Sequence, residues 1–162
     1  MDHEKYSDDY IKGILDDTRI IAMVGASANQ SRPSYFAMKY LQAKRYRVIP
    51  VNPGQAGNKI LGETVYATLD DVPEKIDMVD CFRSADAIPA LAEDAVRLGA
   101  KVLWMQLGIV SEKALNVAED GGLKVVMNRC PKIEYGRLSG EIGWLGVNTG
   151  VISSKRVRRI GP

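Results

Sequence analysis

An α/β protein built on a doubly wound parallel sheet is the fold class that the sequence predicts. Short apolar runs alternate with longer amphipathic stretches, which is the pattern of repeated βαβ units. Most of the runs are rich in valine or isoleucine, as strands covered on both faces are. Five such runs occur, at 20–24, 47–51, 76–82, 102–107 and 125–127. We therefore expect a Rossmann-like sheet of about five strands, in the order 3-2-1-4-5, with helices on both faces.

Helices are predicted between the runs, at 34–43, 85–98 and 111–120. In the middle stretch, the apolar residues fall on one side of a helix and the charged residues on the other. An apolar stripe at helical spacing before residue 19 predicts a leading amphipathic helix that packs on the sheet. A further short helix is expected at 133–138.

The interval 52–72 departs from this alternation, because its prolines and glycines interrupt any helix. We expect a loop there, with a short extra strand at 64–66 and a helical turn at 69–72. At 162 residues with 46% hydrophobic content, the chain fits a single domain, 1–162, with a core at about 14–138. The glycine-rich extension 139–162 carries no clear pattern of regular structure.

The charge balance gives no general attraction to nucleic acid or membranes, since the formal net charge is only +2. A basic segment at 153–159 is the local exception, and solvation explains it better than contact with nucleic acid or an acidic partner. Two cysteines are too few for a disulfide framework, and neither a signal peptide nor a bilayer-spanning stretch occurs. We expect a cytoplasmic protein that does not bind membranes, with a protein partner left open.

The first apolar run ends in Gly25, Ala26 and Ser27 and leads into a helix, which is where an α/β sheet receives a phosphate on backbone N–H groups. The dinucleotide fingerprint needs three glycines, but Ser27 and Gln30 stand where the second and third would be. The acid that would hold the ribose is also missing, because Asn52 follows the second run. NAD is therefore disfavoured, and a serine-capped strand-to-helix turn remains the alternative to a phosphate loop.

Arg32 precedes Pro33 and Ser34 at the predicted helix start. Proline suits the first helical position, and Arg32 places a fork of hydrogen-bond donors beside the positive end of the helix. A cation there opposes the helix dipole unless an anion lies between them. The pattern favours a bound phosphate, with a solvated Arg32 as the alternative.

Six motifs follow one another along the chain, most of them at predicted strand ends: Val24-Gly25-Ala26-Ser27, Ser31-Arg32-Pro33-Ser34-Tyr35, Val48-Ile49-Pro50-Val51-Asn52-Pro53, Asp80-Cys81-Phe82-Arg83, Trp104-Met105-Gln106-Leu107-Gly108 and Asn128-Arg129-Cys130-Pro131. Together they resemble the small bacterial CoA-binding proteins. These consist of one Rossmann-like domain, similar to the N-terminal CoA-binding domain of the succinyl-CoA synthetase α subunit. The resemblance covers about 14–138 and is far more specific than one glycine loop.

The resemblance implies coenzyme A or an acyl-CoA as the ligand. Gly25, Ala26 and Ser27 look like the turn that meets the pyrophosphate, with Arg32 and Ser34 nearby. The other matched positions follow the later strands: Asn52, Pro53 and Gly54 toward the adenosine end, and Phe82, Arg83, Gln106, Leu107 and Gly108 along the remaining wall of the groove.

Cations suit such a ligand, because CoA carries a pyrophosphate, a 3′-phosphate and a long polar pantetheine arm. Arg32, Arg83 and Lys59 are the candidates, and the two arginines also offer bidentate geometry. For Arg83, a surface arginine at a helix start is the alternative.

Catalysis is not expected. Succinyl-CoA synthetase, whose CoA-binding domain the sequence resembles, carries a phosphorylated histidine on a second domain. The single histidine of this sequence is His3. No serine, histidine and acid set and no metal-ligand spacing can be assembled. Cys81, Trp104 and Met105 fit strand packing. The sequence therefore predicts a carrier, sensor or regulatory module that binds CoA.

Two alternatives remain open. One is an NAD(P)-dependent oxidoreductase with the same fold. The other is a thiol-redox protein that CoA modifies at Cys130, since Arg129 and Lys132 are cations that favour a thiolate. An inert cysteine held in a turn by Pro131 is the better interpretation of Cys130.

Overall fold

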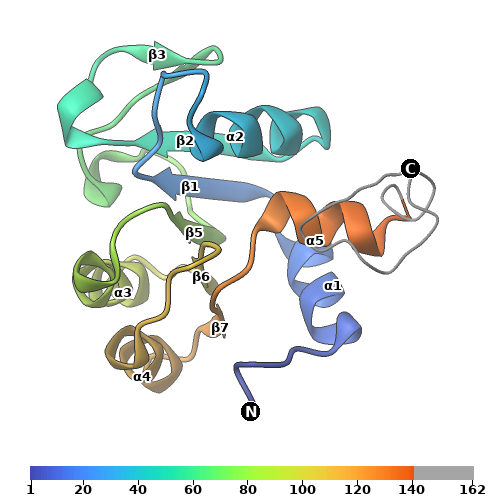
Figure 1. The fold of residues 1–162 in the computed structure, drawn as a ribbon. Coiled ribbons are helices and arrows are strands. Elements are labelled where there is room, and N and C mark those ends of the chain that lie inside the picture. The colour runs from blue at the N-terminus through green and yellow to red at the C-terminus, as the bar shows by residue number, and fades with distance from the viewer. Residues whose placement is uncertain (141–162) are drawn as a thin grey trace. The chain divides into compact units, whose positions relative to one another are not determined.

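The computed structural model describes residues 1–140 (Figure 1). The described residues form two compact units, one of Thr18–Arg129 and one that combines Met1–Asp17 with residues 130–140. Each unit is described by itself, and the expectation of a single domain stays a prediction. Most of the expected extension 139–162, including the basic segment 153–159, lies outside the described residues.

The larger unit is built on a five-stranded parallel sheet, as the sequence predicts. Its strands are β1 (Ile20–Val24), β2 (Arg47–Val51), β5 (Met78–Cys81), β6 (Val102–Met105) and β7 (Lys124–Val126). The first two match the apolar runs to the residue. The run at 102–107 is longer than its strand at the carboxyl end only, whereas the run at 76–82 extends beyond β5 at both ends.

The predicted strand order is wrong. The observed order is β2-β1-β5-β6-β7, so the third long strand pairs with β1 instead of lying outside β2. The chain after β2 explains the difference, because it turns back along the outer edge of that strand. Tyr66 donates its N–H to the Pro50 carbonyl at 3.1 Å, and Asn52 donates its N–H to the Tyr66 carbonyl at 2.8 Å. The outer edge of β2 is occupied there, and β5 pairs with the other side of β1.

This returning segment matches the prediction for 52–72 only in part: a short strand lies at 63–64 instead of 64–66, and the sequence does not predict the turn at 53–55 or the strand at 59–60. It begins with a 3₁₀ turn, η1 (Pro53–Gln55), and forms a small hairpin of β3 (Lys59–Ile60) and β4 (Glu63–Thr64). A second 3₁₀ turn, η2 (Leu69–Asp71), matches the helical turn expected at 69–72.

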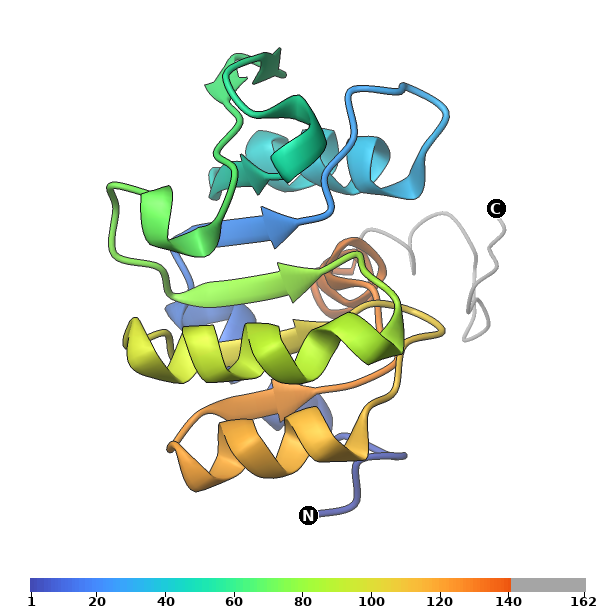
Figure 2. The ribbon, with the colours of Figure 1, turned by 90° about the vertical axis from the view of Figure 1, so that its left-hand side faces the viewer.

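Helices cover both faces of the sheet in this unit. Figure 2 shows α3 (Ile88–Arg97) and α4 (Glu112–Asp120) in front of the sheet and α2 (Pro33–Ala43) behind it. A 3₁₀ turn, η3 (Ala85–Ala87), leads into α3, so the stretch expected at 85–98 is helical in two parts. This arrangement follows from right-handed crossovers, because the chain winds outward from β1 and from β5 in opposite directions.

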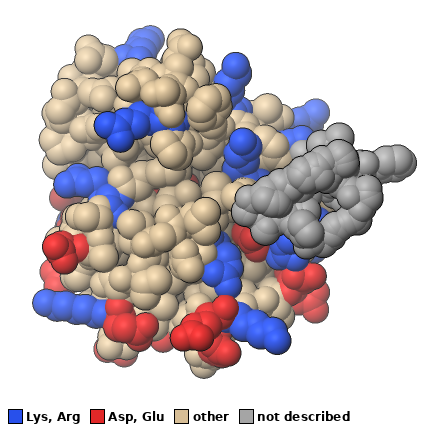
Figure 3. Space-filling view, viewed as in Figure 1, with Lys and Arg blue, Asp and Glu red and all other residues tan. Residues whose placement is uncertain are grey.

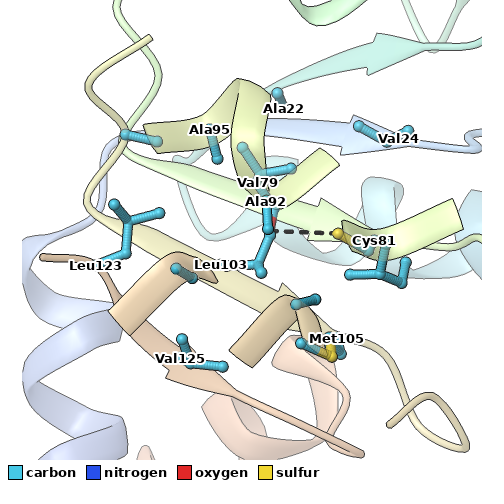
Figure 4. Close-up of a cluster of buried hydrophobic side chains, with 14 of the residues drawn as sticks. Ala22, Val24, Val79, Cys81, Ala92, Ala95, Leu103, Met105, Leu123 and Val125 are labelled. Carbon is cyan, nitrogen blue, oxygen red and sulfur yellow. Dashed lines mark hydrogen bonds between the residues drawn. The ribbon is translucent and has the colours of Figure 1, made fainter. Parts of the chain in front are cut away.

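The core under α3 and α4 consists of small and branched side chains from alternate strand positions. Val79, Cys81, Leu103 and Val125 point from the sheet toward Ala92 and Ala95 on α3 and its neighbour α4 (Figure 4). Alanines on the helix side let the helices approach the sheet closely. The opposite face includes Trp104, which is fully buried and donates its indole N–H to the Arg129 carbonyl at 2.8 Å. The assignment of Trp104, Met105 and Cys81 to strand packing is confirmed.

The smaller unit contains α1 (Asp8–Asp17) and α5 (Pro131–Leu138), which contact each other. Arg137 pairs with Asp8 at 2.8 Å and with Glu134 at 2.9 Å. Both expected helices therefore exist, and the packing of α1 on the sheet stays a prediction. No helix of residues 1–140 has the length and apolar character needed to cross a bilayer.

Asp80 places a carboxyl group in the middle of the sheet. Its neighbours in register are Met23 on β1 and Trp104 on β6. Both side-chain oxygens are buried and find no hydrogen-bond partner among residues 1–140. Burial raises the pKa of Asp80 well above its usual range, so the folded state favours the neutral acid.

Asp80→Asn is expected to stabilise the protein increasingly as pH rises. Above about pH 4 the unfolded carboxyl ionises while the folded one keeps its proton, so the wild type loses stability until the raised folded pKa is passed. Asparagine does not ionise in this range. The unfolding free energy of Asp80→Asn should therefore exceed that of the wild type by an amount that grows by up to about 1.4 kcal/mol per pH unit. Urea unfolding across a pH series measures it, with Asp120→Asn as the matched exposed control. A constant difference between Asp80→Asn and wild type would contradict the assignment.

Candidate functional site

The carboxyl ends of the strands are aligned by hydrogen bonds that continue the sheet past its last residues. Gly25 donates its N–H to the Val51 carbonyl at 2.8 Å, and Phe82 donates to the Val24 carbonyl at 2.8 Å. Gln106 continues the series by donating to the Cys81 carbonyl at 3.3 Å. Gly25, Phe82 and Gln106 therefore lie in register, each about 4.8 Å from the next.

Gly25 stands where the sheet changes winding direction. The chain after β1 leads to β2 on one side, whereas β5 on the other side leads to β6. Open α/β sheets bind ligands in the crevice that opens at such a point, outside the carboxyl ends of the strands. The observed strand order puts this point between Gly25 and Phe82.

A side chain has no room at position 25. Gly25 has a φ of 89°, and a Cβ there would collide with the carbonyl oxygen of Phe82. The same Cβ would lie 3.0 Å from Cδ of Arg83. Glycine therefore lets the two strand ends and their loops approach at the winding point.

A hollow of about 310 Å³ opens beside this approach. Its wall comes from the loop after β1, the first turn of α2, the loop after β2 and the end of β5: Gly25, Ser27, Arg32, Pro33, Ser34, Asn52, Gln55 and Phe82. On the face shown in Figure 3, lysine and arginine predominate over the part with α2, β2 and β3, and acidic side chains gather over α3 and α4. The surroundings of the hollow favour an anion.

The loop after β1 is held by short-range hydrogen bonds. Ser27 donates its N–H to Oγ of the buried Ser34 at 3.1 Å, so Ser34 fixes the turn. Oγ of Ser27 in turn accepts the N–H of Asn29 at 3.0 Å. The loop thus enters α2 in a defined shape and not as a free coil.

Arg32 is the N-cap residue of α2, and its side chain does not cap the helix. Within residues 1–140 no carboxylate lies within ion-pair distance of its guanidinium. A permanent cation therefore stands at the positive end of a helix dipole, on the wall of a hollow. This conflict is relieved when an anion binds between them.

The loop after β2 braces the loop after β1. Asn52 donates its side-chain N–H to the Ala26 carbonyl at 2.9 Å and accepts the N–H of Gly54 at 2.9 Å. Gln55 accepts the N–H of Ala28 through Oε1 at 3.2 Å. The Asn52 amide is thus used within the protein, so Asn52 shapes the hollow through its position.

The structure distributes the predicted site residues unevenly. It gathers Gly25, Ser27, Arg32, Ser34, Asn52 and Phe82 around the hollow. The others lie nearby or further along the same edge: Ala26 is buried beneath the loop, Pro53 and Gly54 form part of η1, Arg83 lies against Gly25, and Gln106, Leu107 and Gly108 follow β6. Lys59 is exposed on β3 and does not line the hollow, and Cys130 belongs to the smaller unit.

Sequence reasoning missed Gln55 and did not count Pro33 as a wall residue. Pro33 was expected only as a helix start, which the structure confirms. For Gln55, the available signal is its spacing of three residues after Asn52, which one helical turn brings to the same side. The sequence alone does not reveal that Gln55 accepts a hydrogen bond from the N–H of Ala28.

The fold and this edge define a Rossmann-like α/β domain, and comparison with known proteins gives its family. The model of the CoA binding domain matches residues 19–136. The uncharacterized protein YneT of Bacillus subtilis (strain 168) is 34% identical over 125 residues, which are 77% of this chain and 91% of YneT. The chain belongs to the CoA-binding domain family.

Solved structures share the fold of this chain. A hypothetical protein from Pyrococcus horikoshii OT3 is 37% identical, with a TM-score of 0.79 over 85% of this chain and 95% of that one. The dinucleotide forming acetyl-coenzyme A synthetase 1 of Ca. Korarchaeum cryptofilum shares the fold at 24% identity, with a TM-score of 0.61. That match covers 70% of this chain and 27% of the synthetase.

Gly25→Ala is expected to destabilise the protein more than Gly99→Ala. Both glycines have positive φ, at 89° and 77°, so alanine brings backbone strain of about 1 to 2 kcal/mol at either position. Only position 25 adds a collision, with the Phe82 carbonyl, whereas nothing lies within 4 Å of a Cβ at position 99. Urea unfolding should show an extra loss of roughly 1 to 3 kcal/mol for Gly25→Ala. Equal losses would mean that the two strand ends do not approach closely.

Proposed function

We propose that this protein binds coenzyme A or an acyl-CoA at the carboxyl edge of its sheet and serves as a carrier, sensor or regulator without catalysis of its own. The observation that carries the proposal is Arg32, a cation without a carboxylate partner within residues 1–140, at the start of α2 on the wall of the hollow. Membership in the CoA-binding domain family supports a CoA phosphate as that anion. A cytoplasmic location stays a prediction.

The pyrophosphate is proposed to bind between the loop after β1 and the first turn of α2. A helix N-terminus offers backbone N–H groups and a partial positive charge to an anion. Arg32 adds a charged fork that matches phosphate oxygens. Arg83, whose Cδ lies close to Gly25, is a second cation within reach of the same place.

The two ends of CoA are proposed to run in opposite directions from there. The adenosine end lies toward η1 and Gln55, with Lys59 on β3 beyond the hollow as a candidate for the 3′-phosphate. The pantetheine arm leads past Phe82 toward Gln106. This path follows the carboxyl ends of β1, β5 and β6, which backbone hydrogen bonds between neighbouring strands keep in register.

A nicotinamide cofactor suits the edge less well. Ser27 stands in the wall where a dinucleotide site needs its second glycine, and Asn52 follows β2 where an acid would hold the ribose. Membership in the CoA-binding domain family favours neither hydride transfer nor a redox role of Cys130. The proposal that the protein has no catalysis of its own rests on the sequence, whose single histidine is His3.

Calorimetric titration of the full chain with CoA, acetyl-CoA, NAD and NADP at one salt concentration tests the proposal. We expect CoA and acetyl-CoA to bind and to compete with each other. Little or no heat is expected from either nicotinamide nucleotide. Binding of NAD or NADP without CoA would overturn the proposed function.

Arg32→Ala is expected to weaken CoA binding by about 1 to 3 kcal/mol, because a charge-assisted hydrogen bond to phosphate is lost. Unfolding free energy should change little, since Arg32 is exposed and does not cap α2 through its side chain. Arg19→Ala is the matched control: it removes the same charge just before β1, at the opposite edge of the sheet. If both variants bind CoA like the wild type, Arg32 is not part of the site.

A further inference from the structure

The loop after β6 presents apolar side chains to solvent at the same edge of the sheet. Leu107 is 57% exposed and Val110 is 48% exposed. Within residues 1–140 the other exposed large apolar side chains are Met1 and Phe36, each on a different element. Single exposed apolar residues are ordinary, but two on one short loop beside a ligand edge point to a contact.

This loop is held in place. Gly108, with a φ of 87°, donates its N–H to Oδ1 of Asn128 at 2.6 Å. Asn128 returns a hydrogen bond from its own N–H to the Ile109 carbonyl at 3.1 Å. Ile109 packs against the core cluster beneath α3 and α4. Because Ile109 points inward and the loop is tied to Asn128, Leu107 and Val110 are exposed as part of a fixed shape.

The loop also lies on the proposed path of the pantetheine arm. The hydrogen bond from Gln106 to Cys81 sets its first residue beside Phe82, which lines the hollow. Gln106 is therefore two strand spacings, about 10 Å, from Gly25. In Figure 2 the loops after β1 and β6 emerge at the same edge, toward which the strand arrows point.

We propose that Leu107 and Val110 form an apolar platform for the acyl chain of an acyl-CoA, so that the protein prefers acyl thioesters of aliphatic acids to free CoA. The inference rests on the proposed function, because the phosphates must first fix the ligand near Arg32. A pantetheine arm that leaves the hollow past Phe82 carries its sulfur toward this loop. An acyl group on that sulfur would contact the side chains of Leu107 and Val110. Free CoA has only a thiol there, so both side chains would stay exposed to water.

The test is a series of titrations of the full chain with CoA, acetyl-CoA, butyryl-CoA and hexanoyl-CoA. Wild-type affinity is expected to rise along the series by about two- to fourfold per added CH₂ until the platform is covered. The double variant Leu107→Ser/Val110→Ser should show no rise along the series. Each affinity is compared with the affinity of the same variant for free CoA, because Leu107 is also a predicted wall residue of the CoA groove. Leu107→Gln/Val110→Thr, which keeps similar side-chain volumes, repeats the test if the serine variant does not fold.

Phe36→Ser is the matched control, since Phe36 is 53% exposed on α2 and lies on a different element. It should keep the wild-type rise with chain length. Equal affinity for CoA and hexanoyl-CoA in the wild type, or a rise that survives the double variant, would overturn the platform while leaving CoA binding intact. Self-association that the double variant abolishes, without dependence on acyl length, would assign the patch to a second copy of the chain. Failure of the wild type to bind any CoA compound would instead reject the proposed function.

Discussion

The carbonyl oxygen of Phe82 occupies the space that a Cβ of residue 25 would need, and the site depends on this approach. It joins the ends of β1 and β5 where the sheet changes winding direction. The loop after β1 can then turn toward α2 and set Arg32 on the wall of the hollow. A larger residue at position 25 would have to push these ends apart, and the loops that line the hollow would move with them.

The strands could be predicted from the sequence, but their order could not. The runs 20–24 and 47–51 are apolar and stop at Gly25 and at Asn52, so their limits follow from local chemistry. Hydrophobicity does not mark where pairing stops in the later runs, because Leu107 is apolar and yet exposed. Strand order depends on contacts between distant segments. Here it follows from the return of Tyr66 along the edge of β2, which no local pattern reveals.

The candidate site likewise has one part that the sequence predicts and another that it does not. Gly25, Ser27 and Arg32 belong to one continuous segment, so a strand, turn and helix pattern predicts that they come together. Asn52 and Gln55 act through hydrogen bonds to the Ala26 carbonyl and the Ala28 N–H, and those partners are known only once β1 and β2 are paired. The buried carboxyl of Asp80 is another feature that appears only after folding, since its unpartnered state depends on three neighbouring strands.

The most direct test of the central claim is to follow backbone amide resonances of the ¹⁵N-labelled full chain by NMR while CoA is added. Binding at the carboxyl edge predicts that the largest shifts fall on residues 25–35, on η1 and on Phe82. Smaller shifts should reach the loop after β6. Shifts confined to the opposite edge, near Arg19 and Lys101, or to the smaller unit, would contradict the account, because the ligand would then bind away from the winding point of the sheet.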